Sequence, residues 1–202
     1  MMNDLTSRGA VVILNDSVIT SNLLAGVDIF WTTELFSPLS SSEISALQTW
    51  LAGGGSLLLE GDEFTDRFND LLATLGTGIE YSSSNNPPSG VSGYIYPHET
   101  TIDVDSLFFS PVGHLLPVGS PATLIAKDPS GGYDLIALAA VGSGRVCAMA
   151  DEAFGDYQLS ISADNQLFGN QVFDWLASGV SWLTLSPDSG TVAVGASQDM
   201  AV

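Results

Sequence analysis

Basic residues are almost missing from this sequence of 202 residues. Four Lys and Arg side chains stand against 23 Asp and Glu, which gives a formal net charge of -19 at pH 7. Nucleic acids and anionic membranes are bound through clustered Lys and Arg, so neither is expected as a partner. The acidity instead fits a solvated surface, a high-salt habitat, secretion or the binding of cations.

Cysteine occurs once, at Cys147, so the chain can form no internal disulfide and no zinc site built on several cysteines. No run of 18 apolar residues occurs, which argues against membrane insertion. The first residues lack the basic and apolar segments of a signal peptide, and this absence alone favours the cytoplasm.

The sequence does contain an alternation of apolar strands and amphipathic helices. Continuous apolar runs predict strands buried on both faces at 10–14, 27–31, 56–60 and 145–150. Apolar stripes at helical spacing predict helices over 43–52, 64–75 and 164–177. The order predicts a flavodoxin-like α/β fold, with a mostly parallel sheet and helices on both faces. A β-hairpin over 123–141 is predicted at its antiparallel edge.

The clearest local signals lie between residues 40 and 62. A serine at 40, 41 or 42 can cap the following helix, and Glu43 places a favourable carboxylate at its start. Three glycines at 53–55 end that helix, and a short apolar strand then leads into the acidic turn at residues 60–62. This is half of a parallel α/β unit.

Residues 79–97 differ, because Ser, Asn, Pro and Gly dominate them, and we expect a long surface excursion. Three tyrosines stand in it, Tyr81, Tyr94 and Tyr96. Exposed tyrosines suit the recognition of sugars or proteins, but these rings could equally hold the excursion against the body of the domain.

The order of several motifs resembles the class I glutamine amidotransferase-like domains. The resemblance is closer to the non-enzymatic members found in bacterial surface and gliding-motility proteins and in the N-terminal domain of an intraflagellar transport protein. It covers residues 10–178. The matching positions of the first half are Asp28, Pro38, Leu39, Ser40, Glu43, Gly54, Gly55, Leu57, Leu58, Leu59, Gly61 and Asp62. Those of the second half are Gly142, Gly144, Arg145, Val146, Asp151, Asp164, Asn165, Asn170, Asp174, Trp175 and Leu176.

The resemblance implies a catalytic cysteine at the turn after residues 57–60, but that turn holds neither Cys nor Ser. Without a nucleophile, a paired histidine has nothing to activate. Cys147 lies within a predicted strand and is expected to be a small buried apolar side chain. No catalytic residue is therefore assigned, and the chain is expected not to be an amidotransferase.

The two ends also depart from the family. Residues 10–14 match its second strand, so the first βα unit is missing, and a homodimer could form through the incomplete sheet or a tail strand. Residues 191–194 are one strand that could fill the gap. We assign residues 1–178 to the α/β domain. Residues 179–202 resemble the start of an immunoglobulin-like repeat of secreted bacterial proteins, which implies an extracellular or cell-surface location within a longer precursor.

Ligands of open parallel sheets bind beyond the carboxyl ends of the strands. The carboxylates expected at that rim are Asp16, Glu34, Asp62, Glu63, Asp151 and Glu152. They could bind a polar ligand or a divalent cation, with calcium possible at Asp62 and Asp151, although no calcium-loop motif is present. The alternative is that they are separate turn and cap residues. His98 could fold over the rim, whereas the simpler interpretation of His98 and His114 is two loop histidines.

The sequence thus favours a non-catalytic recognition or assembly domain of a secreted multidomain bacterial protein, with a protein or glycan partner. The alternatives are a hydrolase that uses the acidic rim, and a structural spacer. A hydrolase should bring a histidine within reach of the rim carboxylates, whereas a binding module should expose aromatic side chains.

Overall fold

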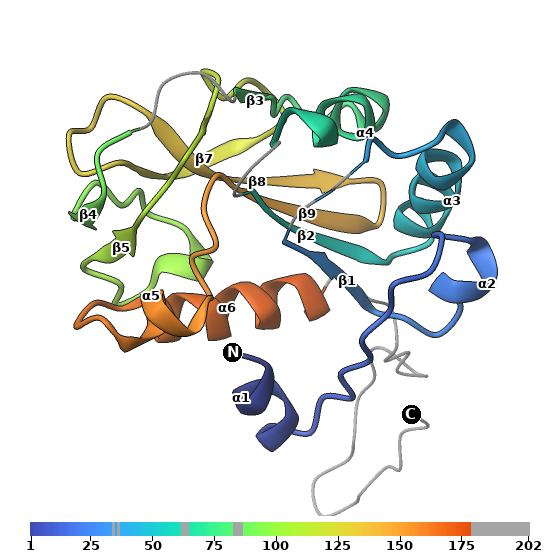
Figure 1. The fold of residues 1–202 in the computed structure, drawn as a ribbon, viewed down its shortest axis with the longest axis horizontal. Coiled ribbons are helices and arrows are strands. Elements are labelled where there is room, and N and C mark those ends of the chain that lie inside the picture. The colour runs from blue at the N-terminus through green and yellow to red at the C-terminus, as the bar shows by residue number, and fades with distance from the viewer. Residues whose placement is uncertain (34, 36, 62–64, 83–86, 179–202) are drawn as a thin grey trace, which may run out of the picture.

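The computed structural model describes residues 1–33, 35, 37–61, 65–82 and 87–178 (Figure 1). The predictions made for residues 179–202, including the immunoglobulin-like repeat and the strand at 191–194, lie outside this part of the chain.

A mixed sheet forms the centre of the domain. Its strand order is β1-β2-β9-β8-β6-β3, and β7 pairs with β8 beside this path. The pairs β1·β2 and β2·β9 are parallel, and the remaining pairs are antiparallel. The bounds are β1 Ile29–Thr32, β2 Ser56–Glu60, β3 Tyr81–Ser82, β6 His114–Leu115, β7 Thr123–Lys127, β8 Asp134–Val141 and β9 Gly144–Met149. The α/β prediction is confirmed, although the antiparallel part extends beyond the predicted hairpin.

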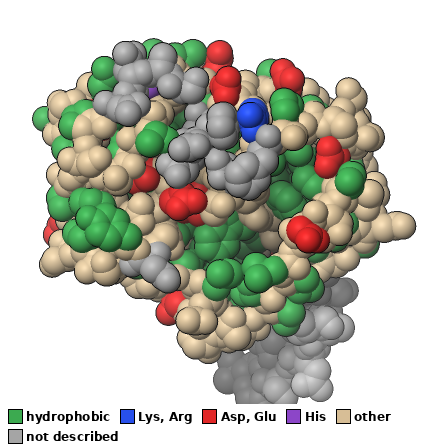
Figure 2. Space-filling view, in the orientation of Figure 1, with side chains coloured by type: hydrophobic (Ala, Val, Ile, Leu, Met, Phe, Trp, Pro, Cys, Tyr) green, Lys and Arg blue, Asp and Glu red, His purple; other side chains and the backbone are tan. Residues whose placement is uncertain are grey.

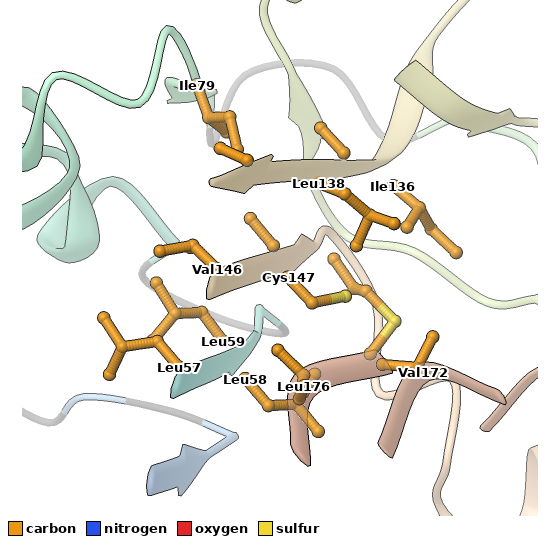
Figure 3. Close-up of a cluster of buried hydrophobic side chains, with 14 of the residues drawn as sticks. Leu57, Leu58, Leu59, Ile79, Ile136, Leu138, Val146, Cys147, Val172 and Leu176 are labelled. Atoms are coloured by element: carbon orange, nitrogen blue, oxygen red, sulfur yellow. The ribbon is translucent and has the colours of Figure 1, made fainter. Parts of the chain in front are cut away.

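Helices cover both faces of the sheet. Leu57 and Leu59 of β2 line one apolar cavity with Leu47 of helix α3 (Ser41–Ala52) and Leu71 of helix α4 (Asn69–Leu75). On the other face, Figure 3 shows Leu58 and Cys147 on the side of Val172 and Leu176, which belong to helix α6 (Asn165–Ser178). Because both faces of β2 are packed, all of its residues are buried and apolar side chains fill consecutive positions.

The shorter elements surround this core. They are the helices α1 (Met2–Ser7), α2 (Ser21–Leu24) and α5 (Asp156–Ser160), the 3-10 turns η1 (Thr65–Phe68) and η2 (Glu99–Thr101), and a separate two-stranded sheet that pairs β4 (Gly90–Ser92) with β5 (Leu107–Phe109). The expected helix over 64–75 is therefore a 3-10 turn followed by α4. The excursion over 79–97 contributes two strands.

The prediction of a buried strand at residues 10–14 is wrong. These residues belong to no helix or strand and are exposed. A strand is buried only when other strands and helices lie beside it, and apolar composition does not supply such neighbours. Edge strand β1 pairs with β2 and with no other described strand.

Helix α3 begins with the predicted cap. The Ser40 side chain accepts a hydrogen bond from the Glu43 amide, and a Glu43 carboxylate oxygen accepts one from the Ser40 amide at 2.9 Å. The other Glu43 carboxylate oxygen accepts from the Ile19 amide at 3.2 Å. These contacts satisfy amides at the helix start and attach the chain before α2 to α3. They also lower the pKa of Glu43, mainly through hydrogen bonds from Ser40.

None of the described helices is both long and apolar enough to cross a membrane.

We predict that Ser40→Ala lowers the free energy of unfolding by about 1 kcal/mol, because the Glu43 amide loses its acceptor at the start of α3. Urea unfolding followed by circular dichroism measures this change. The control is Ser45→Ala on the exposed face of the same helix, which should cost nothing because alanine favours helix. Equal destabilisation by both variants would contradict the capping role.

Candidate functional site

A buried carboxyl group ends strand β2. Glu60 is 1% exposed, and both of its oxygens accept hydrogen bonds. Trp31 of β1 donates its indole N–H to Oε2 at 2.5 Å, and the backbone amide of Phe154 donates to Oε1 at 3.1 Å. The carboxyl group therefore joins β1, β2 and the segment after β9 at one point.

Burial changes the protonation of this group. Loss of solvation raises the pKa of Glu60 from 4.5 to about 8, even though the hydrogen bonds from Trp31 and Phe154 lower it. The nearby charges of Glu152 and Asp151 raise it further. At pH 7 the carboxyl group is therefore mostly protonated and can donate a hydrogen bond.

A cavity of about 330 Å³ opens beside Glu60 at the carboxyl ends of β1 and β2. Its walls include Trp31, Thr33, Glu152 and Phe154, and the first residues of the chain close another side. This is the edge at which ligands of parallel sheets bind. Figure 2 shows acidic side chains spread over one face of the molecule and very little basic surface.

Only part of the expected rim is brought together. Glu152 lines the cavity, and Asp151 is buried next to it, where its Oδ2 accepts from the Ser110 amide at 2.8 Å. Asp16 is exposed and does not line the cavity. Glu34, Asp62 and Glu63 lie outside the described residues. Among the residues that are described, no three His, Cys, Asp or Glu side chains are grouped to hold a metal ion.

The histidines do not line the cavity. His98 caps η2, where its Nδ1 accepts from the Thr100 amide at 3.1 Å, and its ring lies 5.8 Å from that of Trp175. Trp175 also packs under Arg145, near the start of β9 and therefore at the opposite edge of the sheet from the cavity. Burial lowers the pKa of His98. His114 is buried in β6 with its ring 4.8 Å from Tyr133.

Cys147 is fully buried within β9, as predicted, and burial raises the pKa of its thiol well above the usual value. A thiolate is the reactive form of cysteine, so this side chain is chemically protected in the folded chain.

The three tyrosines of the excursion have different positions. Tyr81 is buried, and its hydroxyl lies 3.0 Å from the Leu59 carbonyl and 3.1 Å from the Met149 carbonyl, so it supports the strand ends from within the core. Tyr94 and Tyr96 are 50% and 40% exposed. They remain available to a partner.

Glu60 and Trp31 were missed as site residues in the sequence. A carboxylate that closes an otherwise apolar strand was the available signal, because a buried charge needs partners. Nothing in the local sequence pointed to Trp31.

No protein-family model matches the chain, and no curated protein matches its sequence. Solved structures resemble its fold. The N-terminal domain of mmIFT52 superposes with a TM-score of 0.69 at 20% identity, over 87% of this chain and 88% of that one. A ThuA-like protein from Bacteroides uniformis gives 0.63 at 14% identity, over 87% and 80%. A GMP synthase protein from Thermoplasma acidophilum gives 0.59 at 11% identity, over 87% and 86%.

These likenesses establish a glutamine amidotransferase-like, flavodoxin-like fold. At such low identities they carry the fold alone, since one fold hosts many unrelated functions.

The buried carboxyl group predicts a pH-dependent stability. Between pH 4.5 and about 8 the folded state keeps the Glu60 proton that the unfolded state has lost. Stability from this group is therefore complete below pH 4.5 and decreases as pH rises to about 8, by up to roughly 1.4 kcal/mol per pH unit. Glu60→Gln should remove this slope in urea unfolding at successive pH values.

Glu80→Gln changes an exposed carboxylate and serves as the matched control, which should keep the wild-type slope. If wild type and Glu60→Gln show the same pH dependence, Glu60 is not a buried neutral acid.

Proposed function

We propose that this chain is a non-catalytic recognition domain that binds a ligand or partner without transforming it. One observation carries the proposal: the side chain at the strand end, Glu60, uses both carboxyl oxygens to hold Trp31 and Phe154 in place. A group held in this way positions the surrounding structure.

The other chemically capable side chains support the same conclusion. Cys147 is sealed inside β9, and neither histidine lines the cavity beside Glu60. Nucleophilic catalysis needs a nucleophile and a base within hydrogen-bond reach of each other. Among the described residues, this pairing is not found at the strand ends.

Two surfaces suit recognition. The cavity combines aromatic rings from Trp31 and Phe154 with a few polar groups, as small-molecule sites do. The exposed rings of Tyr94 and Tyr96 offer a face suited to a glycan or a protein. The sequence resemblance to bacterial surface proteins supports an extracellular role within a longer protein as part of this proposal.

One observation favours the alternative, a hydrolase. Glu60 has a raised pKa beside Asp151 and Glu152, and pairs of carboxyl groups with separated pKa values can act as general acid and base. The hydrogen bonds to Glu60 argue against this role, because donation of its proton would leave a charge in a buried site.

An activity assay distinguishes the two functions. We expect no turnover of glutamine or of p-nitrophenyl acetate above the buffer rate, and no difference between wild type and Glu60→Gln. Turnover that disappears in Glu60→Gln and persists in Glu80→Gln would establish the hydrolase and contradict the proposal.

Cys147 offers a separate test. The native chain should react with Ellman's reagent only at the rate at which it unfolds, because the thiol is buried and protonated. In urea the same thiol should react at once. Rapid labelling of the folded protein would mean that a nucleophile is accessible after all.

A further inference from the structure

Residues 11–14 form an apolar segment that the rest of the described chain leaves uncovered. The side chains of Val11, Ile13 and Leu14 are 87%, 77% and 81% exposed, and that of Val12 is 38% exposed. No backbone hydrogen bond joins residues 11–14 to any other described residue. The segment thus presents unpaired backbone groups and β-branched side chains, the two features of a free strand edge.

Both ends of this segment are anchored. Before it, the Arg8 guanidinium contacts Asp174 and donates to the Asn170 side chain at 3.2 Å, which ties the end of α1 to α6. After it, Ile19 is buried and its amide donates to Glu43 at the start of α3. Figure 1 shows the connection from α1 to α2 running along the outside of the domain. Anchored ends lower the entropy that is lost when the segment pairs with another strand.

Charge indicates what pairs with it. Residues 10–14 are all uncharged in a chain of net charge -19. Two copies of such a chain repel each other through their acidic faces, so an uncharged strip is where they can approach. A basic partner would be drawn to the acidic surface and would gain nothing from five apolar residues.

We propose that residues 11–14 of two copies pair as antiparallel strands about a two-fold axis and form a homodimer. The same segment then meets itself, as a two-fold interface requires. The unpaired N–H and C=O groups of each copy satisfy those of the other, and the side chains of the two strands pack across the pair. This interface is independent of the cavity beside Glu60 and of the function proposed for it.

Sedimentation equilibrium of the full chain tests the dimer. We expect a monomer–dimer equilibrium that tightens as NaCl is added, because salt screens the repulsion between the acidic copies. Ile13→Glu places two like charges close together across the axis and should weaken the dimer by at least about tenfold. The control, Ile102→Glu, makes the same charge change at a side chain that is 59% exposed elsewhere, and should leave the dimer unchanged.

Cross-linking identifies the segment directly. Val12→Cys and Ile13→Cys are prepared separately, and Cys147 does not compete because it is buried. Under mild oxidation at least one of them should give a disulfide-linked dimer on a non-reducing gel, and Ile102→Cys should not. A wild type that stays monomeric at high protein and salt concentrations overturns the proposal. So does a dimer that Ile13→Glu leaves intact, or one that Ile102→Cys cross-links equally well.

Discussion

The buried carboxyl group of Glu60 holds the strand ends together. It receives the indole N–H of Trp31 from β1 and the amide of Phe154 from beyond β9, so three chain segments meet at one side chain. Burial of a carboxylate would be costly, and the group avoids that cost by keeping its proton near pH 7. Tyr81 reinforces the same region, since its hydroxyl reaches the ends of β2 and β9 from within the core.

This arrangement gives the strand ends a structural role. In related enzymes the sequence resemblance places a nucleophile just beyond this point, whereas here the carboxyl group that precedes the turn is committed to two hydrogen bonds. Cys147 contributes only apolar contact in β9. The fold thus keeps its usual ligand-binding edge while its chemically capable side chains serve packing.

The sequence predicted the features that depend on neighbours along the chain. The cap of α3 by Ser40 and Glu43 is local, and the apolar run of β2 is long enough to require burial on both faces. Residues 10–14 carry the same apolar pattern as β2, yet they are exposed, because burial depends on neighbours in space. The Glu60 site was missed for the same reason, since its partners lie 29 and 94 residues away in the chain.

The most direct test of this account is a ¹³C NMR titration of the glutamate side-chain carboxyl groups in the folded protein. The account predicts one glutamate that titrates near pH 8 and whose signal is absent from Glu60→Gln. If every glutamate instead titrates near its usual pKa of about 4.3, the Glu60 carboxyl group is ionised and solvated, and the structural role given to it is wrong.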